Sequence, residues 1–225
     1  MTPASPSARL GPLVRYITVD YAKSQRWAPA VLFWVVSESV ALVTESALLP
    51  ACATSSVLLL FVSAWLTVGL ANSEDPVQAA ITAAAAGGFR RLQTGRLASA
   101  LLCGAAVACI SMIPIAVVAR SGLSGADLGG GLLAQLVSVL TGVAVGTLAA
   151  PPVVTRAAWT ALATVVLCGA TVVIPDAVPT RQMLTLLNGA PGAHLALTLA
   201  LYAAGAAAFL VVTAGIATAV MSRRG

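Results

Sequence analysis

The chain has 225 residues, of which 59% are hydrophobic and only 8% are charged, and its mean hydropathy is +0.97. Soluble domains carry about 25% charged residues, so this composition excludes a soluble globular domain. It predicts an all-α, polytopic membrane protein with six transmembrane helices in a single domain, residues 1–225. The net charge of +5 indicates no nucleic-acid partner, because the basic residues flank apolar runs and form no extended basic face.

A basic amphipathic helix is predicted first, over residues 12–27. Leu13, Val14, Ile17 and Tyr21 recur at helical spacing and predict one apolar stripe. The predicted interface residues of this helix are Arg15, Tyr16, Asp20, Lys23 and Arg26. Such a helix suits the inner membrane surface, although a basic flank to the first span would have a similar composition.

Six apolar runs long enough to cross a bilayer are expected next. They lie near residues 28–49, 53–71, 97–119, 129–150, 157–175 and 195–220. Pro50 is expected to break the helix between the first two, which then form a tight hairpin. With the N-terminus inside, only Arg120 and Arg181 of the 12 basic residues lie outside, so both termini are expected in the cytoplasm and the chain in the plasma membrane.

The connection between the second and third spans predicts a capped cytoplasmic helix. Asp75 is an N-cap candidate, Pro76 suits the first helical position, and Gln78 completes a capping-box spacing. Gly87 and Gly88 are expected to end this helix.

The whole connection, residues 72–91, is longer than a turn requires. Its helix, residues 76–86, would carry a small, mildly apolar surface that includes Val77 and Ile81. A freely solvated linker needs neither the caps nor this surface. Docking into a shallow groove is therefore expected, either on the protein's own spans or on a cytoplasmic partner.

The other long connection, residues 175–194, is expected outside as a re-entrant or interfacial segment. Thr180 can cap a short helix and Gly189 can stop it. In the fourth expected span, residues 129–150, Gly142 and Gly146 form a GxxxG pair, for which packing within the chain is favoured over a dimer face.

This order of elements resembles the membrane subunit of type-2 ABC exporters, the ABC-2 type permease family. The resemblance covers nearly the whole chain and is one of layout. It implies that residues 76–86 are a coupling helix, which seats in a cleft of an ATP-binding-cassette ATPase subunit, and that the N-terminal helix adjoins that subunit. By position, the implied coupling residues are Glu74, Asp75, Pro76, Gln78, Ile81, Arg90 and Arg91. It also implies a second permease copy or paralogue, as a homodimer or heterodimer, with the translocation path between them.

The chain is not expected to be an enzyme by itself, and its cysteines show neither a zinc spacing nor a redox CxxC pair. A phosphate-binding loop needs glycines before a lysine, but the only lysine, Lys23, stands in "YAKSQ". ATP and Mg²⁺ are therefore expected on the partner ATPase, with no cofactor in this chain. Its four scattered cysteines are expected to serve packing.

Glu38 and Glu45 are the carboxylates expected within the first span, seven residues apart and on nearly the same helix face. Each has a structural interpretation, with Glu38 hydrogen-bonded in the bundle and Glu45 at the interface. Each could also line a translocation path, and Glu38 could then serve a proton-coupled secondary carrier.

Two further functions remain open. Ser124 in "GLSG" and His194 in "GAHLAL" resemble the motifs of rhomboid intramembrane proteases, which implies an intramembrane serine hydrolase. The long first outer loop and the span-two histidine of that family are missing. A scaffold or immunity-type membrane protein would need no chemistry in the spans.

Overall fold

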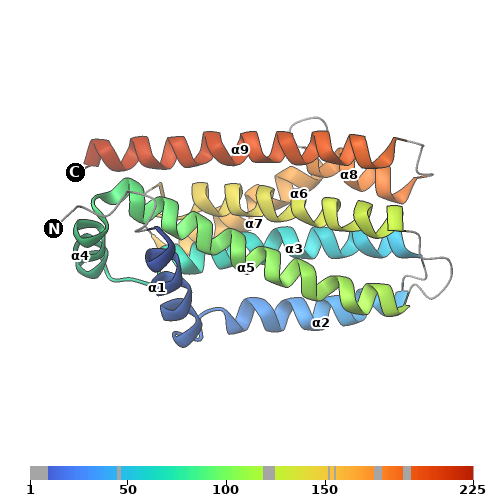
Figure 1. Cartoon of the computed structure of the whole chain (residues 1–225), viewed down its shortest axis with the longest axis horizontal. Coiled ribbons are helices and arrows are strands. Elements are labelled where there is room, and N and C mark those ends of the chain that lie inside the picture. The colour runs from blue at the N-terminus through green and yellow to red at the C-terminus, as the bar shows by residue number, and fades with distance from the viewer. Residues whose placement is uncertain are drawn as a thin grey trace.

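The computed structural model describes residues 10–44, 47–118, 125–151, 153–154, 156–174, 179–189 and 194–224, and over these residues every regular element is an α-helix. The helices are α1 (Leu10–Lys23), α2 (Ala28–Thr44), α3 (Leu48–Ala71), α4 (Pro76–Ala86), α5 (Phe89–Val118), α6 (Gly125–Ala149), α7 (Ala157–Val173), α8 (Pro179–Asn188) and α9 (Leu195–Arg224). The long helices run along one axis, and α1, α4 and the end of α9 lie toward the same end (Figure 1).

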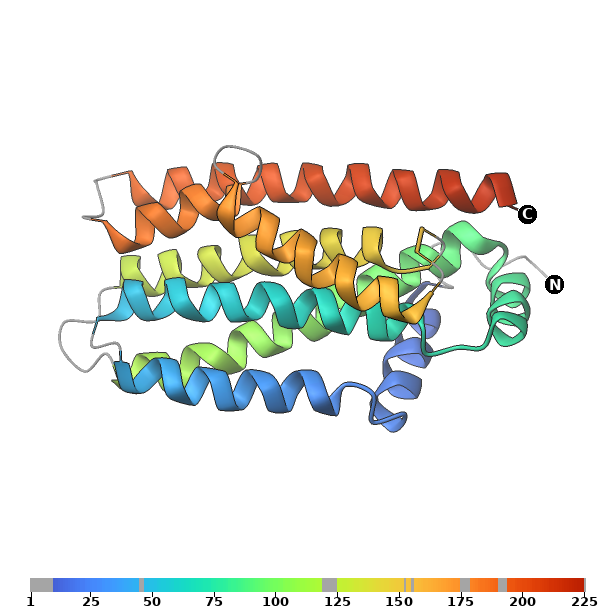
Figure 2. The same cartoon turned by 180° about the vertical axis from the view of Figure 1, so that it is seen from behind.

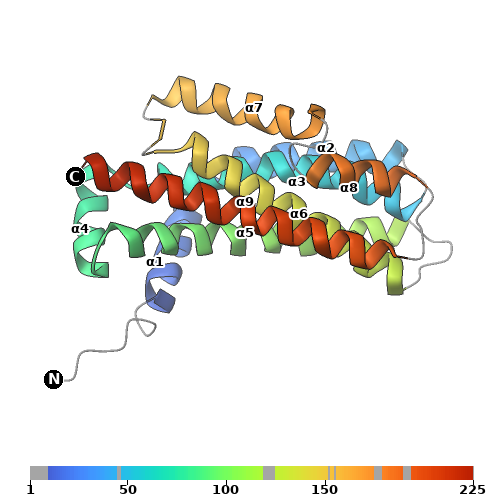
Figure 3. The same ribbon diagram turned by 90° about the horizontal axis from the view of Figure 1, so that it is seen from above.

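Within the described residues, four helices are long and apolar enough to cross a membrane: Leu48–Ala71, Phe89–Val117, Gly125–Ala149 and Leu195–Met221. The pair α1 and α2, which is bent by 75°, adds a fifth if it is counted as one span. The protein is therefore an all-helical, multi-pass membrane protein. The 17 residues of α7 are about 26 Å long, less than a hydrocarbon core of about 30 Å. This helix slants across the bundle and lies at its margin (Figures 2 and 3).

The centre of the bundle is the contact between α3 and α6. In the most apolar parts of these helices, 67% and 72% of the residues are buried. A Cβ atom added at Gly142 would lie 2.5 Å from the Leu60 carbonyl oxygen, and one added at Gly146 would lie 2.6 Å from that of Ala64. The two backbones meet directly here, so the GxxxG pair packs within the chain, as the sequence favoured.

Two predicted helix boundaries are wrong. Pro50 does not separate two helices but lies in the first turn of α3, where its missing N–H group removes no helical hydrogen bond. Thr180 does not cap α8; it is the second residue of that helix, and its buried hydroxyl group contacts the Thr141 hydroxyl at 3.3 Å. Both errors arose because α3 and α8 begin earlier than predicted.

Replacing Gly142 or Gly146 by alanine is expected to lower the free energy of unfolding by about 1–3 kcal/mol, because the added methyl groups must force the α3 and α6 backbones apart. Gly169→Ala in α7 is the matched control, since nothing lies within 4 Å of a Cβ atom added there. Thermal unfolding of the purified chain in detergent, followed by tryptophan fluorescence, measures the difference. Equal midpoints for all three variants would contradict this account of the core.

Candidate functional site

The helix predicted between the second and third spans is present with the predicted ends. The Asp75 carboxylate accepts a hydrogen bond of 2.9 Å from the backbone N–H group of Val77, which is N-cap geometry. Gly87 has a left-handed φ of 87°, and the N–H group of Gly88 donates to the Ala83 carbonyl oxygen at 2.7 Å. Local capping chemistry therefore defines α4, independently of the rest of the bundle.

Glu74 attaches α4 to α5. Its carboxylate forms an ion pair with Arg96 of α5, with 2.8 Å between Oε2 and Nη2, and it accepts a hydrogen bond of 3.1 Å from the Thr82 hydroxyl group. The side chains of Glu74 and Arg96 are only 3% and 13% exposed, so salt screens this pair weakly. The carboxylate that the resemblance placed at an ATPase contact points inward, and the sequence analysis missed its partner, Arg96.

Helices α1 and α4, which the sequence analysis described as separate elements, are in contact. The Gln78 side-chain amide donates a hydrogen bond of 3.2 Å to the Tyr16 hydroxyl group. Nearby, the Arg26 guanidinium group donates to the backbone carbonyl oxygen of Asn72, just before α4. Residues far apart in the chain therefore meet at this end of the bundle.

The apolar stripe of α1 packs against protein. Ile17 and Tyr21 are 3% and 2% exposed. Two glycines allow this close approach: a Cβ atom at Gly95 of α5 would lie 3.1 Å from Ile17, and one at Gly69 of α3 would overlap the Tyr21 hydroxyl oxygen. On the other side of α1, Arg15, Tyr16 and Lys23 are exposed, and Asp20 is half-buried.

The outer side of α4 is apolar and uncovered. Val77 and Ile81, one helical turn apart, are 70% and 66% exposed, and Phe89 at the start of α5 is 51% exposed. We call these three residues the α4 surface. With 11 residues, α4 is too short to cross a bilayer.

The arginines that follow α4 have different roles. Arg90 is exposed beside the α4 surface, whereas the Arg91 guanidinium group donates to the Ala86 carbonyl oxygen at 3.2 Å. Arg91 therefore satisfies a carbonyl group at the end of α4 and reinforces its C-terminus. Of the two, Arg90 is the cation that remains free to meet a partner.

A second candidate site lies inside the bundle at Glu38 of α2, which is 4% exposed. The Ser55 hydroxyl group of α3 lies beside the carboxyl group, and the Gln135 amide of α6 donates to that hydroxyl group at 3.5 Å. Neither Glu38 carboxyl oxygen, nor the Gln135 amide oxygen, has a hydrogen-bond partner of normal geometry. We call these three residues the Glu38 cluster. No lysine or arginine is among the buried side chains of the described part of the chain, so no basic group compensates a charge at Glu38 from within the core.

Several predicted residues cannot be related to this cluster. Glu45 and Ser124 lie outside the described residues. His194 is exposed where α9 begins. The relation between Glu38 and Glu45, and the pairing of Ser124 with His194, therefore stay predictions.

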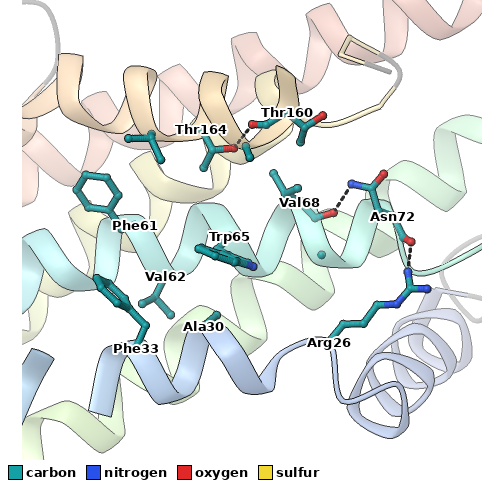
Figure 4. Close-up of a pocket in the computed structure, with 13 residues that line it drawn as sticks. Arg26, Ala30, Phe33, Phe61, Val62, Trp65, Val68, Asn72, Thr160 and Thr164 are labelled. Carbon is teal, nitrogen blue, oxygen red and sulfur yellow. Dashed lines mark hydrogen bonds between the residues drawn. The ribbon is translucent and has the colours of Figure 1, made fainter. Parts of the chain in front are cut away.

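An open cavity of about 670 Å³ lies between α2, α3 and α7. Figure 4 shows Arg26 at one end, and the aromatic rings of Phe33 and Phe61 toward the other. The Thr160 hydroxyl group donates to the carbonyl oxygen of Arg156, just before α7, and the Thr164 hydroxyl group donates to that of Thr160. The lining is therefore mainly apolar away from Arg26. We call this feature the α2/α3/α7 groove. The sequence analysis missed it because three segments far apart in the chain form its walls.

No protein-family model, curated protein or solved structure matches this chain. Within the described residues, no group of three or more histidine, cysteine, aspartate or glutamate side chains could hold a metal ion. The cysteines Cys52, Cys103, Cys109 and Cys168 are free. The functional argument therefore depends on the α4 surface, the Glu38 cluster and the α2/α3/α7 groove.

Replacing Glu74 by alanine is expected to loosen α4, because it removes a charged hydrogen bond and leaves Arg96 unpaired. Such bonds contribute about 1.5–3 kcal/mol, so amide exchange in residues 76–86 should accelerate by about 10- to 100-fold. Hydrogen-exchange mass spectrometry measures this locally. Arg90→Gln removes an exposed charge nearby and should leave exchange unchanged; equal rates in the wild type and Glu74→Ala would show that the ion pair does not hold α4.

Proposed function

We propose that the chain is the membrane subunit of an ATP-driven exporter of the ABC-2 permease type, and that a separate ATP-binding-cassette ATPase binds the α4 surface. One observation carries this proposal. The short capped helix α4 is fastened to the bundle by Glu74, while Val77, Ile81 and Phe89 face away from it. An exposed apolar surface on a well-anchored helix is typical of a protein contact.

The contacts beneath α4 suggest how such a subunit would respond. A push on α4 would reach α5 through the pair Glu74 and Arg96, and α1 through the hydrogen bond between Gln78 and Tyr16. Because α1 joins α2 at a bend of 75°, a shift of α1 would tilt α2. ATP and Mg²⁺ would bind only to the motor, whose closure would supply the push.

In this proposal α2 and α7 also cross the bilayer, giving six spans with both termini in the cytoplasm of a plasma-membrane protein. Each has 17 residues, or about 26 Å, and local thinning of the bilayer can accommodate a span a few ångströms short. The positive charges beside α1 and α4 favour the cytoplasm. A second copy or a paralogue would complete the path.

Replacing Val77 and Ile81 together by aspartate is expected to abolish ATPase binding, because two charges would have to be buried in an apolar contact. We would purify the tagged chain from the membranes of the cells that naturally produce it, and measure the amount of co-purified ATP-binding-cassette ATPase and its hydrolysis rate. A loss of at least about 100-fold in affinity corresponds to roughly 2.7 kcal/mol.

Thr94→Asp is the control for this experiment, because Thr94 is exposed on α5 and is not part of the α4 surface. It adds a negative charge without touching the proposed contact, and should leave binding intact. Full binding by the Val77 and Ile81 double variant, with an unchanged thermal midpoint, would remove the exporter proposal.

A proton-coupled carrier is the second candidate, and the Glu38 cluster favours it. A buried carboxyl group whose oxygens have no hydrogen-bond partner of normal geometry is an unusual and often functional feature within a membrane. In this alternative Glu38 would bind and release a proton as the substrate crosses. The chain would then transport without a motor.

Proteoliposomes that contain only this chain separate the two candidates. With a metabolite extract from the source cells supplied on one side, a carrier is expected to move protons with its substrate, measured with an entrapped pH-sensitive dye. Glu38→Gln should abolish that flux because glutamine cannot carry the proton. Ser56→Ala changes another buried polar side chain and controls for altered packing. If the wild type shows no flux above empty liposomes, the carrier candidate fails.

A further inference from the structure

The α2/α3/α7 groove has the length of one membrane leaflet. Along α3 its lining extends from Phe61 to Asn72, eleven steps of 1.5 Å, or about 16 Å. Half of a hydrocarbon core of about 30 Å is roughly 15 Å. Phe33 and Trp65 line the groove and are 50% and 51% exposed, so its walls can receive an apolar chain from the bilayer.

The polar end of the groove carries one positive charge. Arg26 is exposed between α1 and α2, and its guanidinium group donates to the Asn72 carbonyl oxygen. Among the described residues no carboxylate forms an ion pair with Arg26. A guanidinium group has five N–H donors, so Arg26 retains donors and an unneutralised charge for an anion at the mouth of the groove.

We propose that this groove binds an anionic phospholipid, with one acyl chain along Phe61 and Trp65 and the head-group phosphate at Arg26. Three features select this occupant: the apolar lining, the match to one leaflet in length, and the single cation at the end. Planar guanidinium groups bind phosphate oxygens well. The site goes beyond the proposed exporter function, since it requires neither an ATPase nor transport.

The first test compares head groups. Purified chain in detergent is mixed with equal amounts of phosphatidylglycerol and phosphatidylcholine that have identical acyl chains, and native mass spectrometry counts the lipid retained. An arginine contributes about 1 kcal/mol to binding an anionic lipid, which corresponds to an approximately five-fold preference for phosphatidylglycerol. Arg26→Gln should bring the ratio close to one, and Arg26→Lys should restore much of the preference.

Arg90→Gln is the matched control, since Arg90 is an exposed arginine at the same end but does not line the groove. It should keep the wild-type ratio. The proposal is overturned if Arg26→Gln keeps the preference, if Arg90→Gln abolishes it equally, or if the wild type retains both lipids equally.

The second test fills the groove. Ala161 lines it from α7, so Ala161→Phe should reduce retention of both lipids several-fold, whereas Ala158→Phe, at an exposed position of α7 outside the lining, should not. The same spectra report the number of protomers. Unchanged lipid retention in Ala161→Phe overturns the proposal. If dimers dissociate while lipid retention is unchanged, a second copy of the chain occupies the groove instead.

Discussion

The close contact between α3 and α6 is the constraint on which the rest of the structure depends. Because Gly142 and Gly146 have no side chains, the backbone of α6 at these two residues lies directly against the backbone and side chains of α3. In a membrane, lipid tails are as apolar as leucine, so close packing of small residues supplies much of the attraction between helices. The remaining helices are arranged around this pair, with α5 and α9 more exposed. Their apolar outer faces are available to lipid or to a second subunit.

The cytoplasmic end proposed here uses a different kind of interaction. Outside the spans, α4 has few residues with which to bury apolar area, and a helix of 11 residues is marginal by itself in water. The Asp75 cap defines where it begins, and the buried ion pair of Glu74 with Arg96 defines where it sits. The ion pair holds α4 on the side that faces α5, and Val77 and Ile81 stay exposed. A helix held in this way can transmit a displacement, whereas a flexible linker would absorb it.

The Glu38 cluster and the α2/α3/α7 groove differ in where their ionisable group lies. At Glu38, a carboxyl group is enclosed without a basic partner, an arrangement that costs stability. In the groove, the polar group lies at the end, where Arg26 remains accessible, and the interior is apolar. The first arrangement suits a group that exchanges a proton, and the second suits an amphiphile whose charge stays at the interface.

The sequence by itself determined the membrane class, the all-helical fold and the ends of α4. These follow from composition and from capping between residues at most a few positions apart, such as Asp75 with Val77, and so need no knowledge of distant segments. Only the tertiary structure decided that Glu74 turns inward to Arg96 and that Gln78 reaches Tyr16. It also decided that Glu38 lies beside Ser55 of α3, whose hydroxyl group accepts from Gln135 of α6. The local sequence predicted Pro50 and Thr180 wrongly. A proline is compatible both with the first turn of a helix and with a break between two helices, and a threonine occurs both within helices and at N-caps. Which partner a side chain meets depends on how helices pack, and packing is set by contacts between segments far apart in the chain.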